Sequence, residues 1–137
     1  MRVTRTLRGK LKAGGQERVI VDDGVFTDGW RVTGFDCFPT NATGPDVQGI
    51  LSISEQGLTG GWDASDNRQI GWSFMFVGTA GGDSRSYFLP DQVIVRDLWV
   101  QNFGTDPMNY LIRVERQVLS DDQAILALIQ ERSQDDI

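Results

Sequence analysis

The sequence predicts an all-β fold, namely an antiparallel β-sandwich of about eight strands with one C-terminal α-helix. A jelly-roll-like strand order is one arrangement that fits this prediction. Alternation of polar and apolar residues with a period of two dominates the first 119 residues, and Gly, Pro, Asp and Asn separate the alternating segments. A capped apolar run follows. The 137 residues suffice for a single domain with its own core. We expect strands within 1–119, a helix over 120–132 and a polar tail over 133–137.

The strand assignments rest on alternation and on turn residues. Residues 2–12 alternate a polar face with a mostly apolar face, and Arg5 is the exception. Residues 69–77 are strongly apolar and aromatic, which indicates a buried strand. Residues 55–67 hold three glycines and three acidic residues, and residues 78–84 are rich in glycine, so we expect loops in both segments. The expected strands cover residues 2–12, 17–21, 30–38, 47–54, 69–77, 86–89, 92–103 and 110–119.

The predicted helix begins with a capping box, in which Ser120 is the N-cap and Gln123 the third helical residue. Residues 124–129 are apolar on every side of the helix, whereas a surface helix shows one apolar stripe. Such a helix either closes the open end of its own sandwich or docks on a neighbouring subunit. For the second alternative we expect the interface at Ile125, Leu128 and Ile129.

Composition removes several kinds of chemistry. The chain has no histidine and a single cysteine, which excludes Ser-His-Asp and Cys-His catalytic systems, His-ligated metal sites and disulfides within the chain. The net charge of −6 opposes nucleic-acid binding by the chain as a whole. No apolar leader or membrane-spanning segment is visible in the sequence. We therefore expect no catalytic residues, no metal, no cofactor, no nucleic acid and no membrane partner.

Charge is distributed unevenly along the chain. No acidic residue precedes Glu17. The last seventeen residues, in contrast, carry five acidic residues and a single basic residue, Arg132. A basic start and an acidic end suit contacts between copies or with a differently charged partner. In the alternative interpretation, the basic residues simply lie on a solvated strand. The predicted partner interface at this basic arm comprises Arg2, Arg5, Arg8, Lys10 and Lys12.

Three other patterns in the sequence match chemical sites only in part. Residues 63–67 place oxygens as a calcium loop begins, but Arg68 stands where the loop glycine would be and Phe74 where the bidentate glutamate would be. Residues 78–84 are glycine-rich but lack the lysine of a phosphate-binding loop. Glycoside hydrolysis needs two facing carboxyl groups, and no pair stands out in the sequence. The eligible carboxylates are Asp22, Asp23, Asp28, Asp36, Asp63 and Asp66.

Two tryptophans follow glycines at the expected ends of loops. Trp30 follows Asp28-Gly29, and Trp62 follows two glycines. A tryptophan in such a position can stack on a sugar ring or anchor a protein interface. Trp62 can also fold back over the sheet. We therefore take Trp30 and Trp62 as candidate glycan or interface contacts.

Several short blocks of the sequence resemble a known group of proteins. The blocks are TRTLR (4–8), VDDG (21–24), DNRQIGW (66–72), LPDQVIVRDL (89–98), MNYLI (108–112) and SDDQAILALIQERSQDDI (120–137). As a set they are similar to small marine bacteriophage proteins of about this length. The resemblance implies a capsid-associated virion protein and assigns no catalytic or binding residue.

These observations together favour a non-enzymatic virion structural protein, a decoration or cement protein that contacts the capsid repeatedly. We expect a homo-oligomer, made in the host cytoplasm, whose partners are other virion proteins and above all the major capsid protein. The alternative is a receptor- or glycan-binding module at a virion vertex or tail tip that uses Trp62 or Trp30. An enzyme such as a cell-wall glycosidase is a third hypothesis, which the carboxylate spacing does not support.

Overall fold

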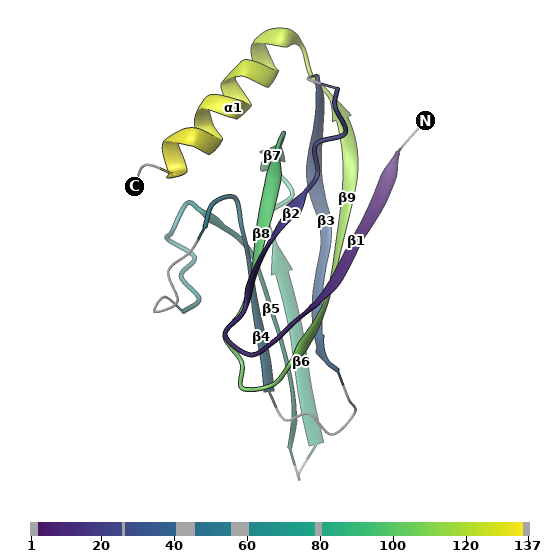
Figure 1. Ribbon diagram of the computed structural model, residues 1–137, viewed down its shortest axis with the longest axis vertical. Helices are drawn as coiled ribbons and strands as arrows, with labels where there is room; N and C mark the ends of the chain where they lie inside the picture. The colour runs from purple at the N-terminus through teal and green to yellow at the C-terminus, as the bar shows by residue number, and fades with distance from the viewer. Residues whose placement is uncertain (1–2, 26, 41–45, 56–60, 79–80, 136–137) are drawn as a thin grey trace.

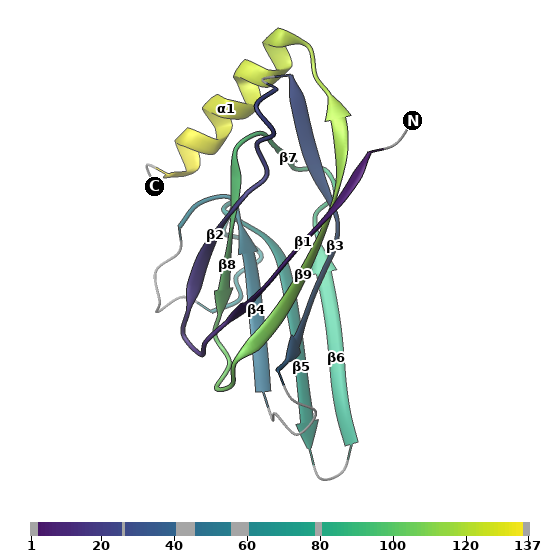
Figure 2. The ribbon, with the colours of Figure 1, turned by 45° about the vertical axis from the view of Figure 1, so that its right-hand side comes forward.

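The computed structural model describes residues 3–25, 27–40, 46–55, 61–78 and 81–135. They form two antiparallel β-sheets and a C-terminal helix (Figures 1 and 2), so the predicted fold class is confirmed. The elements are β1 (Thr4–Leu11), β2 (Gln16–Ile20), β3 (Asp28–Pro39), β4 (Asp46–Ser52), β5 (Gln69–Gly78), β6 (Gly81–Phe88), β7 (Val93–Ile94), β8 (Asp97–Asn102), β9 (Met108–Val118) and α1 (Asp121–Asp135).

The strand order is that of a jelly roll. One sheet has the order β1-β9-β3-β7, and the other has the order β2-β8-β4-β5-β6. The pairs β1 with β9, β2 with β8, β3 with β7 and β4 with β5 are nested, as in a long hairpin that has been wrapped into two layers. β6 is an additional strand that pairs with β5 at the edge of the five-stranded sheet.

The core lies between the two sheets. On β1 the even residues Thr4, Thr6, Arg8 and Lys10 are exposed, as the alternation predicts. Each large aliphatic side chain buried in the core contributes about 1.5–3 kcal/mol. The core residues from the longer strands include Trp30, Val32, Phe35, Val47, Leu51, Ile70, Leu98, Val100, Met108, Tyr110, Ile112 and Val114.

Two strand predictions differ from the structure. Residues 92–103 form β7 and β8, which belong to different sheets, rather than one strand. The expected loop over residues 78–84 is wrong, because β6 begins at Gly81 and forms a hairpin with β5. The exposed residues of β6 are largely polar, so this edge strand lacks the apolar alternation by which strands are recognised.

The C-terminal helix begins where the capping box predicts. The backbone N–H of Gln123 donates to Ser120 Oγ at 3.2 Å, and the N–H of Ser120 donates to Gln123 Oε1 at 3.0 Å. Asp121 and Asp122 lie in the first turn, where a negative charge favours the helix dipole. The helix continues to Asp135, three residues past its expected end at 132.

A chain of hydrogen bonds joins the two sheets along one side of the sandwich. β7 pairs with β3 only at Trp30 and Arg31, so β7 does not cover β3 near Cys37. Instead, the Cys37 N–H donates to Ser73 Oγ at 3.0 Å, and Ser86 Oγ donates to Asp36 Oδ1 at 2.9 Å. The Oγ atoms of Ser73 and Ser86 are 2.8 Å apart. Because the Ser86 hydroxyl already donates its proton to Asp36, the Ser73 hydroxyl donates to Ser86 Oγ.

The two sheets pack closely at Gly49 on β4. A Cβ at position 49 would overlap Cys37 Sγ, so we expect Gly49→Ala to cost about 1–3 kcal/mol by overpacking. In a Cys37→Ala background the clashing atom is absent and the cost of Gly49→Ala should fall. Denaturant unfolding of the two single variants and the double variant measures this coupling. An equal cost in both backgrounds would contradict this packing.

Candidate functional site

Helix α1 packs on the body of the protein through small residues. Ala124 and Ala127 are buried and Leu128 is half-buried, and they lie in a cluster with Val95 and Leu119. This cluster is separate from the main core and covers the end of the sandwich near β7 (Figure 1). The helix therefore closes the end of its own sandwich, which is the first of the two alternatives that the sequence left open.

The opposite side of α1 is apolar and exposed. Ile125, Leu126 and Ile129 are 48%, 59% and 53% exposed. At about 100° per residue, these three side chains lie on the side of the helix opposite Ala124 and Ala127. We call Ile125, Leu126 and Ile129 the outer helix face.

The outer helix face differs from the predicted interface by one residue. Leu128 was expected at a subunit boundary, but it packs partly against its own chain, and Leu126 is exposed instead. An apolar run on every side of a helix does not indicate which side faces inward, so the sequence could not make this distinction.

Further exposed apolar side chains lie at the same end of the molecule. Val118 ends β9 and Val25 precedes β3, and both are exposed. The Leu119 N–H donates to the Thr27 carbonyl at 2.7 Å, which holds these two segments together beside the start of α1. Figure 2 shows this end, with the loop before β3 next to the helix.

The basic arm is divided between solvent and core. Arg8, Lys10 and Lys12 are exposed on or next to β1. Lys10 pairs with Asn109 near the start of β9, so it lies at the end of β1 farther from α1. Arg2 lies outside the described residues. The exposed part of the arm is thus Arg8, Lys10 and Lys12.

Arg5 and Trp30 are engaged within the chain, which corrects both predictions. Arg5 Nη1 donates to the Val21 carbonyl at 2.9 Å, and its guanidinium lies 5.1 Å from the centre of the Trp30 ring. Trp30 is 2% exposed and belongs to the core. The expected loop position was wrong because β3 begins at Asp28, so Trp30 lies inside the strand and faces the other sheet.

Trp62 lies over the outer face of the five-stranded sheet and remains 39% exposed. Its ring centre is 5.5 Å from that of Phe74, and the Phe74 and Phe76 rings are stacked at 6.1 Å. Trp62 thus both folds onto the sheet and keeps a free surface. The sequence did not single out Phe74 and Phe76, because an apolar run on a strand indicates burial and not which rings remain exposed.

Gln69 holds the Trp62 loop in place. Its Oε1 accepts hydrogen bonds from the Asp63 N–H at 2.9 Å and from Trp72 Nε1 at 2.8 Å. Its Nε2 donates to the Gly61 carbonyl at 3.1 Å. One buried amide therefore fixes the residues on either side of Trp62 to the start of β5.

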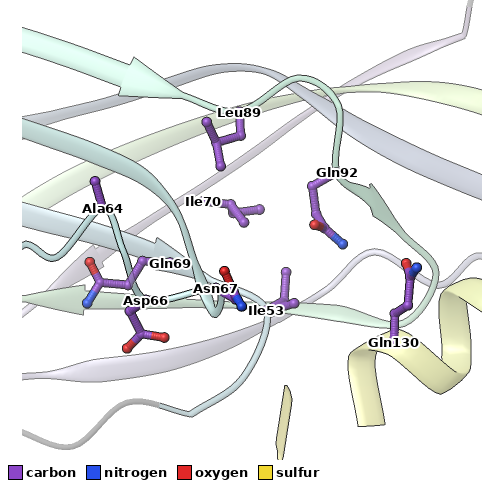
Figure 3. A pocket seen from close by; sticks show the side chains of 9 residues that line it. All are labelled: Ile53, Ala64, Asp66, Asn67, Gln69, Ile70, Leu89, Gln92 and Gln130. Carbon is purple, nitrogen blue, oxygen red and sulfur yellow. The ribbon is translucent and has the colours of Figure 1, made fainter. Parts of the chain in front are cut away.

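A pocket of about 320 Å³ lies between this loop, the segment that joins β6 to β7, and α1 (Figure 3). Asp66 is ion-paired with Arg68 at 2.8 Å, and the Arg68 guanidinium lowers the pKa of the Asp66 carboxyl. Asp66 is therefore ionised near neutral pH and unsuited to donate a proton. The pocket is lined by Ile53, Ala64, Asp66, Asn67, Gln69, Ile70, Leu89, Gln92 and Gln130.

The loop over residues 63–67, which resembles the start of a calcium loop, uses the Asp63 carboxylate for hydrogen bonds within the loop. Asp63 Oδ1 accepts hydrogen bonds from the Ser65 N–H at 3.0 Å and from the Ser65 hydroxyl at 2.6 Å. Within the described ranges, no group of three or more metal-binding side chains comes together. In that same part of the chain, no helix is long and apolar enough to cross a membrane.

The structure brings together two of the eligible carboxylates, Asp23 and Asp28, which are hydrogen-bonded to each other. Burial, this hydrogen bond and the Asp23 charge raise the pKa of Asp28. Desolvation opposes a lower pKa for Asp23, but hydrogen bonds from the Val25 N–H and from Asp28 outweigh it and lower that pKa. When the pair holds a single proton, these opposite shifts place it on Asp28, which then donates to Asp23.

Asp28→Asn tests this shared proton. Because the Asp28 pKa is higher in the folded state, its contribution to stability is present below the unfolded pKa of about 3.9 and is lost as pH rises through the folded value. An asparagine can donate to Asp23 at any pH. We expect the denaturation midpoint of Asp28→Asn to exceed that of the wild type at pH 7 and to converge with it at acid pH. Asp91→Asn, at an exposed position, is the control, and a lower midpoint for Asp28→Asn at pH 7 would refute the shared proton.

No protein-family model matches the chain, and no curated protein has a similar sequence.

Proposed function

We propose that this chain is a non-enzymatic structural protein of a phage virion, which decorates or cements the capsid through repeated subunit contacts. The observation that carries the proposal is the outer helix face, where Ile125, Leu126 and Ile129 are directed into solvent. Covering each of these side chains with another protein surface is worth up to about 1.5–3 kcal/mol.

The orientation of α1 is the reverse of an ordinary surface helix. A helix that only closes its own domain buries its large apolar residues and exposes its small or polar ones. Here Ala124 and Ala127 are inside and the isoleucines are outside. A second protein surface against the outer helix face accounts for this arrangement, because it supplies the burial that the chain itself does not.

Exposed charges favour a second copy as one of the partners. Asp121 and Asp122 lie exposed at the start of α1, and Arg8, Lys10 and Lys12 lie exposed along β1. Opposite charges on two different parts of one molecule suit a contact in which α1 of one copy meets β1 of the next. Such a head-to-tail contact can repeat around a ring or across a lattice.

The fold and the sequence blocks support the same proposal. Jelly rolls recur in capsid proteins, although the fold also serves other functions and does not decide between them. The blocks that resemble marine phage proteins point to a virion component. In this proposal the chain is made in the host cytoplasm, and its partners in the virion are the major capsid protein and further copies of itself.

Ile125→Glu combined with Ile129→Glu tests the subunit contact. Two charges on the outer helix face should abolish self-association, because they would have to be desolvated at the interface. Light scattering of the full chain over a range of concentrations measures the change in mass. Gln130→Glu adds a charge to the same helix at an exposed polar position and is expected to leave self-association unchanged.

Two results would contradict this proposal. The first is a wild-type chain that stays monomeric at every concentration. The second is a double variant, folded by circular dichroism, that associates as the wild type does. Mass spectrometry of purified particles adds a direct test, since a decoration or cement protein is expected there in many copies.

A further inference from the structure

The outer face of the five-stranded sheet carries a line of aromatic rings that does not include the outer helix face. Side chains of alternate residues on β5 point to the same side, and Ser73 and Met75 face inward. Phe74 and Phe76 therefore face outward, and Trp62 rests on Phe74. We call Trp62, Phe74 and Phe76 the aromatic strip.

The aromatic strip is open to solvent and aligned with β5. Trp62 and Phe76 are 39% and 43% exposed. The Phe74 and Phe76 rings are nearly parallel, with 13° between their planes. Successive ring centres are 5.5 Å and 6.1 Å apart, so the rings form a continuous track rather than an isolated contact.

Polar side chains border the strip on both sides. Phe74 pairs with Gln48 of β4 and with Arg85 of β6. Phe76 pairs with Asp46 of β4 and with Asp83 of β6. Because directly paired residues share one face of a sheet, an amide, a guanidinium and two carboxylates flank the rings.

We propose that the aromatic strip binds a linear stretch of neutral polysaccharide. The C–H faces of pyranose rings stack on aromatic rings, and the successive rings along β5 would receive successive sugars. Sugar hydroxyls both donate and accept hydrogen bonds, which suits a border that holds amide, guanidinium and carboxylate groups. This binding surface goes beyond the proposed assembly function and does not use the outer helix face.

The charges around the strip oppose two other classes of occupant. Asp46, Asp83 and Arg85 together carry one more negative than positive charge, which disfavours nucleic acids and other polyanions. An apolar partner would have to desolvate these charged side chains at a cost. A neutral ligand rich in hydroxyl groups meets neither penalty.

The strip is also held in its binding conformation. Gln69 bonds to both sides of Trp62, through the Gly61 carbonyl and the Asp63 N–H. The other two rings stand on a strand that is paired on both sides. Little ordering is therefore required when a ligand binds, which favours affinity.

Affinity electrophoresis in native gels tests this proposal. The full chain is run in gels that contain barley β-glucan, hydroxyethyl cellulose, galactomannan or dextran, and in a gel with alginate as the polyanionic probe. We expect at least one neutral polysaccharide to retard the wild type. Trp62→Ala and Phe76→Ala should each weaken binding by about tenfold, the equivalent of about 1.4 kcal/mol. Ile20→Ala, a comparably exposed apolar position on β2, should change nothing.

Several outcomes would overturn the proposal: no retardation by any of the four neutral polysaccharides, retardation by alginate alone, or equal retardation of the wild type and a folded Trp62→Ala variant. Trp62→Phe keeps an aromatic ring and should retain part of the binding. If Trp62→Ala weakens self-association instead, the strip is a subunit contact and the carbohydrate proposal fails. The variant that combines Ile125→Glu with Ile129→Glu separates polysaccharide binding from self-association. It should lose self-association while polysaccharide retards it as much as it retards the wild type.

Discussion

Nested antiparallel pairing is the constraint on which the rest of the structure depends. Since β1 pairs with β9, β2 with β8, β3 with β7 and β4 with β5, strands from the first half of the chain pair with strands from the second half. Most connections must then cross between the sheets at the two ends of the sandwich. β9 delivers α1 to one end, and the β5–β6 hairpin projects at the other (Figure 1). Both proposed surfaces derive their positions from this pairing.

Short-range signals in the sequence were sufficient wherever the interaction itself is local. The capping box at Ser120 involves residues three apart, and the alternation on β1 reflects one strand and the core beneath it. Both were predicted correctly. Gly24 takes a positive φ of 85°, which the local Asp-Asp-Gly sequence favours. Such features need no knowledge of what lies far away in the sequence.

Features that depend on distant partners could not be predicted. Arg5 interrupts an apolar face because its guanidinium packs on Trp30, twenty-five residues further along the chain. β6 exists because β5 offers it a pairing edge, although its own composition resembles a loop. The split of residues 92–103 into β7 and β8 reflects the change of sheet, and apolar character alone does not encode sheet membership. The same holds for the candidate site. Phe74 belongs to an exposed aromatic surface because Trp62 packs beside it, and that contact cannot be recognised from the sequence around Phe74.

The inverted helix is best explained by two requirements acting on one element. Ala124 and Ala127 allow the helix backbone to approach Val95 and Leu119 closely, which seals the end of the sandwich with little side-chain volume. A helix under that requirement alone would carry polar residues on its other side, because exposed isoleucine and leucine reduce solubility and add nothing to the fold. In the proposed assembly function, contact with another subunit is the second requirement, and Ile125, Leu126 and Ile129 meet it. Because the inner contacts seat the helix, the outer helix face is presented rigidly, and a partner can bind it without first ordering it.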